Sequence, residues 1–255
     1  MNESNLFEML DKNGKKYSKP LNEIGANDRD GEDKTGLILS VIRGDIDSAK
    51  IFLEKGTDVN AVDRYGCTAL HYAAMRNHKD VLELLLENNA NVEIKGGINS
   101  ETAIHIAAAR GNLEGVRMLL QYKASIESTN MYKQTPLHIA AKHGQIKVVE
   151  ILLNEKAVMD AKDYHGSAPI DEAARFSHYG VVGKFLSLGQ TVSDKMKSYI
   201  KNCHSKEELE KLESFINEFP SNSSQSNDLN SKATKEEEIF EKLNLKQKES
   251  NGQFR

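Results

Sequence analysis

TPLHIAA, at residues 135–141, is the clearest copy of a pattern that recurs along this chain. Close copies begin at Thr68 and Thr102, and weaker copies begin at Thr35 and Ala168. The copies therefore start at 35, 68, 102, 135 and 168, in steps of 33, 34, 33 and 33 residues. Similarity at a fixed period of this size is typical of a repeat architecture, in which each repeat is one small structural unit.

A second apolar segment follows each copy, as in 81–86 and 148–153. Its apolar residues recur three and four positions apart, which predicts an amphipathic helix. Small and polar residues come next, and Gly56 and Asn89 suit the left-handed residue that ends a helix. Each repeat is thus predicted to be a helix pair. One pair is too small to bury its apolar face alone, so neighbouring pairs must stack.

The period and the T-P-L-H-x-A core resemble the ankyrin repeat over about residues 31–190. This resemblance implies an all-α solenoid of about five helix-pair repeats with β-hairpin-like loops. The first copy lacks the Pro and His, and Asp171 replaces the His in the fifth; end repeats are often atypical because one side faces water. An extra residue near Lys95 predicts a longer loop between repeats two and three. The predicted repeats within 34–190 are 34–62, 63–94, 95–128, 129–161 and 162–190.

Each copy after the first ends in an Ala pair, which predicts that the first helices of neighbouring repeats approach closely there. The pairs are 73/74, 107/108, 140/141 and 173/174. A larger residue at these positions should overpack the contact between repeats.

The segments outside the repeats are expected to cover the ends of the stack. Residues 1–33 are polar apart from an apolar cluster within 6–10, which we interpret as a short capping helix. Residues 191–219 indicate a C-terminal helical cap of two helices, the first over about Ser193–Asn202 and the second from Ser205. Residues 220–255 lack core-forming side chains, which predicts a disordered polar tail.

Composition excludes several classes of protein. The net charge of −4 argues against a nucleic-acid partner, since a phosphate backbone favours a basic surface. The chain has two cysteines, Cys67 and Cys203, which lie far apart in the sequence. A disulfide framework needs more cysteines, which favours a reducing compartment. The N-terminal residues lack the apolar core of a signal peptide. No apolar run approaches the roughly 18 residues that cross a bilayer. We therefore expect a cytoplasmic monomer without membrane insertion.

The sequence offers no catalytic or metal-binding motif. His71, His105 and His138 recur one per repeat, whereas a metal ion holds its ligands within about 2.3 Å of one point. The resemblance instead implies that this His is structural and hydrogen-bonds near the Thr of its own motif. Gly96-Gly97 lacks the context of a phosphate-binding loop. The sequence therefore predicts no enzyme, no metal and no cofactor, and a cryptic active site within 191–219 is a remote alternative.

The resemblance also implies where a partner binds, namely at the hairpin tips and on the exposed side of the inner helices. Transferred position by position, the hairpin residues are Arg64, Tyr65, Asn99, Glu101, Met131, Tyr132, Gln134, Tyr164 and His165. The inner-helix residues are Arg43, Met75, Arg76, Arg110, Lys142, His143, Arg175 and Phe176.

Two rows are expected within this set. Tyr65, Tyr132 and Tyr164 are assigned to one hairpin position. The inner-helix row is assigned to Arg43, Arg76, Arg110, His143 and Arg175. Tyr and Arg often dominate binding energy, and a basic groove with aromatic side chains favours an acidic peptide or protein surface. The alternative is that the basic residues only complement the C-terminal ends of the helix dipoles.

The leading hypothesis is a non-catalytic protein-binding scaffold that acts as a bacterial effector on a host protein. The C-terminal stretch 235–245, with Glu236, Glu237 and Glu238, resembles the translocation signal of type IV secretion effectors from intracellular bacteria, among which ankyrin repeats are frequent. The protein is then secreted into a host cell. Any Glu-rich tail has this composition, so an ordinary intracellular adaptor or inhibitor remains the alternative.

Overall fold

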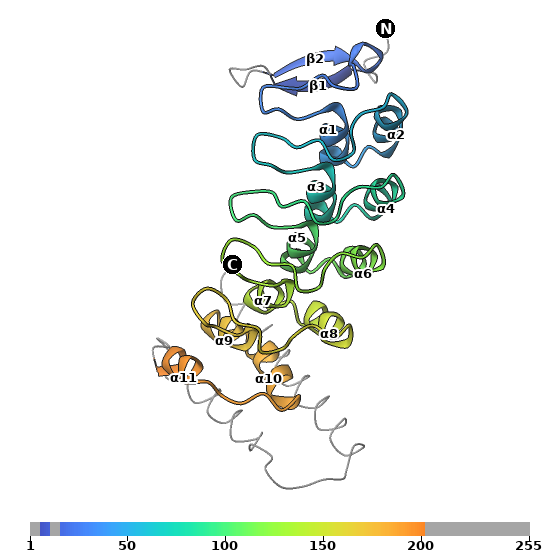
Figure 1. Cartoon of the computed structure of the whole chain (residues 1–255). Coiled ribbons are helices and arrows are strands. Elements are labelled where there is room, and N and C mark those ends of the chain that lie inside the picture. Colours follow the sequence, from blue (N-terminus) through green and yellow to red (C-terminus); the bar gives the residue numbers. More distant parts are fainter. Residues whose placement is uncertain (1–5, 11–15, 202–255) are drawn as a thin grey trace, which may run out of the picture.

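Five helix pairs stack along one axis in the computed structural model, which describes residues 6–10 and 16–201 (Figure 1). The inner helices are α1 (Gly36–Arg43), α3 (Ala69–Arg76), α5 (Ala103–Arg110), α7 (Pro136–Lys142) and α9 (Pro169–Arg175). The outer helices are α2 (Ile46–Glu54), α4 (Lys79–Glu87), α6 (Leu113–Gln121), α8 (Ile146–Asn154) and α10 (Tyr179–Ser187). The predicted all-α repeat solenoid is confirmed.

Local sequence sets the ends of each inner helix. The residue before the helix is extended and is Thr in the first four repeats; the Thr35 hydroxyl, for example, accepts a hydrogen bond from the Ile38 N–H at 3.2 Å. Pro136 occupies the first helical position of α7, where its missing N–H has no cost. A left-handed residue follows every inner helix. These residues are Gly44, Asn77, Gly111, Gly144 and Ser177.

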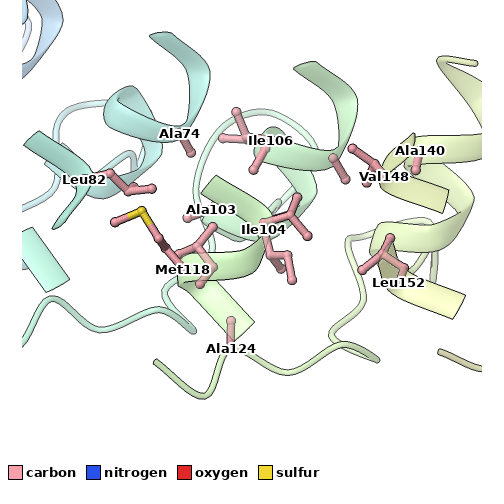
Figure 2. Packing of buried hydrophobic residues seen from close by; sticks show 14 of the residues in the cluster. Ala74, Leu82, Ala103, Ile104, Ile106, Met118, Ala124, Ala140, Val148 and Leu152 are labelled. Carbon is pink, nitrogen blue, oxygen red and sulfur yellow. The ribbon is translucent and has the colours of Figure 1, made fainter. Parts of the chain in front are cut away.

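The inner helices form the centre of the core. All the alanines of the four predicted pairs are at most 4% exposed, and consecutive inner helices contact one another there. Figure 2 shows Ile104 and Ile106 of α5 between Ala74 of α3 and Ala140 of α7. Because alanine has only one side-chain carbon, the helix backbones can approach closely while branched residues fill the space toward the outer helices.

The loops that lead into α3, α5, α7 and α9 project away from the outer helices as hairpins (Figure 1). An acidic or amide side chain closes most of them: the Asp63 carboxylate accepts from the N–H groups of Tyr65 and Cys67, both at 2.9 Å. Asp30, Asn130 and Asp163 make the equivalent bonds. Buried side chains thus hold these four hairpins in shape.

The N-terminal end of the stack differs from the prediction. Residues 6–10 form a strand, β1 (Leu6–Leu10), which pairs antiparallel with β2 (Lys16–Pro20); the predicted capping helix is wrong. An isolated five-residue helix is unstable in water. The sequence between the strands contains Asn13-Gly14, a strong hairpin signal that our helical interpretation overlooked. A short 3-10 turn, η2 (Leu21–Glu23), follows, and Met9 and Ile24 are buried against the first repeat.

The helix predicted from Ser193 corresponds to α11 (Asp194–Lys201), which packs against α9 and buries Met196 completely. The Ser193 hydroxyl accepts from the Met196 N–H at 2.9 Å and donates to the Asp171 carboxylate. The predicted second helix and the tail 220–255 lie outside the described residues. Along 6–10 and 16–201, none of the helices has the length and apolar character that a membrane span requires.

Candidate protein-binding surface

The exposed C-terminal ends of the inner helices carry a basic row. Arg43, Arg76, Arg110 and His143 each lie eight residues after the N-cap, and all four are exposed. Phe176 occupies the equivalent position in the fifth repeat and is also exposed. The assignment of Arg175 to this row is therefore wrong. Arg175 lies one residue earlier, in line with Lys142, because the copy that contains it begins at Ala168.

Charge is distributed unevenly between the two layers of helices. The inner helices α1, α3, α5 and α7 contain no carboxylate at all. The outer helices α2, α4, α6 and α8 carry the acidic side chains instead. These are Asp47, Glu54, Asp80, Glu83, Glu87, Glu114 and Glu150. The exposed side of the first four inner helices is thus positively charged, while the opposite layer is mixed to acidic.

The basic character fades at the fifth repeat. Glu172 of α9 is almost fully buried, and its carboxylate lies 3.7 Å from the Arg175 guanidinium. Burial raises the pKa of Glu172 above its ordinary value, although the Arg175 charge opposes this. The Lys142 ammonium and the Arg175 guanidinium lie 5.6 and 5.4 Å from the centre of the Phe176 ring. These cations are therefore held partly by groups of their own chain.

A row of apolar side chains runs along the hairpin tips. Tyr65 and Tyr132 are 51% and 41% exposed and lie three residues before their N-caps. Tyr164 is 67% exposed but lies four residues before its N-cap, so its placement beside them at one position is wrong. His165 is the true equivalent of Tyr65, and Arg64 and Met131 are the equivalents of Tyr164.

Hydrogen bonds between hairpins confirm this alignment. The N–H groups of Arg64, Met131 and Tyr164 each donate to a carbonyl of the preceding hairpin, at 3.2, 2.9 and 2.8 Å. The acceptors are Glu32, Asn99 and Tyr132, each three residues before its own N-cap. The tips therefore form a continuous ladder in which each hairpin positions the next.

Gln134 does not belong to the exposed surface. It is only 6% exposed, and its side-chain amide donates to the Asp163 carboxylate at 3.4 Å. Its backbone N–H donates to the Asn130 side chain at 3.0 Å. Asn99 and Glu101 are half-buried, and their carbonyls accept bonds from neighbouring repeats. Glu101 and Gln134 each lie directly before an N-cap, at the base of the hairpin and not at its tip.

Ile98 is a surface residue that the sequence analysis missed. It is 89% exposed, more than any other large apolar side chain in the described part of the chain. It lies in the hairpin that carries the extra residue. The sequence signal for it is the extra residue near Lys95, which lengthens this hairpin.

The three motif histidines connect consecutive repeats. The Nδ1 atoms of His71, His105 and His138 accept from the Thr N–H at the N-cap, at 3.0, 3.3 and 3.2 Å. Their Nε2 atoms lie 3.0 Å from carbonyl oxygens of the following hairpin, at Glu101, Gln134 and Ser167. Since a carbonyl only accepts, Nε2 carries the proton. Each neutral imidazole therefore joins its own helix to the next hairpin.

Burial makes the motif histidines and Cys67 less reactive. It lowers the pKa of all three histidines, that of His105 to about 4. Burial also raises the pKa of the Cys67 thiol to about 11, which suppresses the reactive thiolate. Among residues 6–10 and 16–201, no three His, Cys, Asp or Glu side chains are grouped so that they could hold a metal ion.

Comparison with known proteins agrees with this architecture. A family profile described as ankyrin repeats matches residues 3–96, 37–130 and 104–196. Ankyrin repeat and SAM domain-containing protein 1A of Homo sapiens is 49% identical over 43 residues, which cover 17% of this chain and 4% of that protein. Serine/threonine-protein kinase 12 of Arabidopsis thaliana is 42% identical over 69 residues, covering 26% and 15%.

A smaller relative is matched over more of its length. Notch-regulated ankyrin repeat-containing protein A of Danio rerio is 34% identical over 64 residues, 25% of this chain and 57% of that protein. The chain thus covers only a small part of the first two relatives and little more than half of the third. The matched stretches are 43 to 69 residues long, and of these three relatives the kinase is the one whose name states an activity.

Proposed function

Because this chain belongs to the ankyrin-repeat family, we propose that it is a non-catalytic scaffold that binds another protein. The binding surface consists of the exposed side of the inner helices together with the hairpin tips. The observation that carries this proposal is the row of exposed hairpin residues beside a basic helix layer, namely Tyr65, Ile98, Met131, Tyr132 and Tyr164. Exposed apolar side chains grouped on one side of a repeat stack have no role in its core, and such groups mark interaction sites.

The charge distribution supports an acidic partner. Arg76 and Arg110 are exposed on helices without carboxylates, so no neighbouring acid on those helices neutralises them. Arg and Tyr are enriched among the residues that dominate binding energy. An acidic peptide or an acidic protein surface complements this arrangement, and unlike charges also accelerate association.

The test is a quantitative pull-down with the full chain as bait. One variant carries Tyr65→Ala, Arg76→Ala, Arg110→Ala and Tyr132→Ala. The control variant removes two basic and two exposed apolar residues elsewhere, through Lys79→Ala, Arg117→Ala, Tyr122→Ala and Val158→Ala. We expect a partner that the parent and the control retain and the first variant loses. A partner that both variants retain would place the binding site outside this surface.

We further propose that the scaffold acts inside a host cell as a bacterial effector secreted by a type IV system. The support is the Glu-rich stretch 235–245 in the sequence, outside the described residues. A translocation assay on residues 221–255 fused to a reporter tests it. Transfer that is lost when Glu236, Glu237 and Glu238 become Ala supports the proposal. Failure of the intact tail to direct transfer leaves the ordinary adaptor or inhibitor as the function.

A further inference from the structure

The third hairpin differs in length from the other four. Gly96 and Glu101 exchange two backbone hydrogen bonds, at 2.8 and 2.9 Å, and enclose four residues. The corresponding bond in the second hairpin, from the Asp63 N–H to the Cys67 carbonyl at 3.0 Å, encloses three. The first, fourth and fifth hairpins also enclose three. The extra residue predicted near Lys95 therefore enlarges the tip that carries Ile98.

This longer tip is held firmly on both sides. The Gly97 N–H donates to the Tyr65 carbonyl at 2.8 Å, and the Asn99 carbonyl accepts from the Met131 N–H at 2.9 Å. Gly96 lies so close to the second hairpin that an added Cβ would come within 2.5 Å of the Gly66 carbonyl oxygen. The backbone on either side of Ile98 is therefore bound to a neighbouring repeat. A side chain displayed on such a framework loses little further freedom on binding.

The surroundings of Ile98 are apolar and positively charged. Tyr65 and Met131, the residues bonded to its hairpin through the backbone, are both half exposed. Lys95 is exposed on the same hairpin, whereas the Arg64 guanidinium donates to the Gly31 carbonyl of the first hairpin and the Lys133 ammonium lies over the Tyr164 ring of the fifth. The carboxylate of Asp63 is buried and occupied by its own hairpin. Ile98 thus projects between hairpins that expose apolar side chains, and Lys95 is the exposed cation of its own hairpin.

From this geometry we infer that the partner is a folded protein that receives Ile98 in an apolar pocket with an acidic side chain at its rim. The inference rests on the proposed function and narrows its partner class. A peptide laid along the inner helices can contact Arg76 and Arg110, but it does not enclose a side chain that projects from a hairpin tip. Only a concave surface removes water from all sides of an 89% exposed isoleucine. The pocket supplies the apolar contact, and the acidic side chain at its rim meets Lys95.

The experiment compares two displayed libraries made from the same set of proteins, one of intact folded domains and one of short linear peptides. The full chain is the bait, with Ile98→Ser as the test variant and Ile98→Val as the conservative control. Because Ile98 lies outside the core, both variants should keep the parent's circular dichroism and melting temperature. Folded domains should be enriched, and Ile98→Ser should weaken them about tenfold or more while Ile98→Val does not.

The other outcomes overturn the inference in distinguishable ways. Binders that ignore Ile98→Ser but are lost with the Tyr65, Arg76, Arg110 and Tyr132 substitutions would reject the anchor and leave the proposed function standing. Enrichment of linear peptides alone would reject the folded partner. Binders indifferent to both sets of substitutions would reject the proposed function as well. Self-association of the parent in sedimentation, abolished by Ile98→Ser, would make a second copy of this chain the occupant.

Discussion

At the scale of single residues, the motif histidines stabilise the contact between repeats as well as the start of their own helix. The imidazole of His105 accepts from Thr102 in its own repeat and donates to the Gln134 carbonyl in the next. Both ring nitrogens are therefore occupied, one within a repeat and one between repeats. In the fifth repeat the following segment offers the Ser193 hydroxyl, a donor, and the residue at this position is Asp171, an acceptor. The departure from the repeat pattern thus follows the chemistry of its neighbour.

The first prediction concerns the pH dependence of stability. Burial lowers the pKa of His105 from 6.5 to about 4. The unfolded chain takes up a proton as the pH falls through 6.5, whereas the folded chain does so only near 4. Neutral, buried His105 therefore makes its full contribution to the free energy of unfolding above pH 6.5. This contribution falls by about 3 kcal/mol as the pH drops toward 4. Urea unfolding should show that parent and His105→Gln converge in stability between about pH 7 and about pH 5. A constant difference would contradict it.

At the scale of elements, the contact between inner helices depends on side-chain size. The second prediction is that Ala140→Leu in α7 lowers the free energy of unfolding by roughly 1–3 kcal/mol, because the site is fully buried between α5 and α9. Ala109→Leu in α5 is the control, since Ala109 is half-buried at the exposed end of its helix. Chemical denaturation measures both. Equal losses in the two variants would show that helix propensity or general crowding, and not the inner contact, sets the cost.

The third prediction concerns the last described helix. Ser193 caps α11 through the Met196 N–H and links it to Asp171 of α9. Ser193→Ala should weaken α11 by about 1 kcal/mol, as loss of a helix cap does. Hydrogen exchange of the α11 amides measures this local effect, with Ser198→Ala, at an exposed position of the same helix, as the control. Faster exchange throughout the repeats, and not in α11 alone, would contradict a local capping role.

At the scale of the whole molecule, stacking turns a small difference between helices into an extended surface. Every repeat presents its inner helix on the same side, so an Arg at the same position in successive repeats becomes a row. The outer helices gather the carboxylates on the other layer. A partner therefore approaches a molecule whose two faces differ in charge, although the net charge is only −4.

The fourth prediction follows from this asymmetry. Reversal of charge through Arg76→Glu and Arg110→Glu should slow association with the captured partner by about tenfold at low salt. The parent's association rate should itself fall as salt is added. At 0.1 M salt, mobile ions largely screen the interaction between surface charges that are more than about 10 Å apart. Lys79→Glu and Arg117→Glu on the outer helices provide the matched control. Surface plasmon resonance separates the rates, and an equal slowing by the control would show that net charge, not this face, steers binding.

The resemblance to the ankyrin repeat implied the structural role of the histidines. The sequence by itself determined the repeat number, the helix pairs and the alanine contacts. These follow from the period and from interactions within one repeat, which recur in each copy. It also located the insertion that lengthens the third hairpin. The pattern within one repeat predicts most of the stack, because each repeat contacts only its neighbours.

Only the tertiary structure decided which side chains reach the surface and which residues align across repeats. Hydrogen bonds between hairpins shift Tyr164 from its assigned row, and the start of α9 after Ala168 shifts Arg175 from its row. Contacts from the next repeat bury Gln134, and the strand pair replaces the predicted N-terminal helix. The projection of Ile98 likewise depends on how three hairpins bond to one another. The strand pair is local, and its sequence signal is Asn13-Gly14. The burial of Gln134 and the projection of Ile98 arise between repeats, where periodicity within a single copy carries no information.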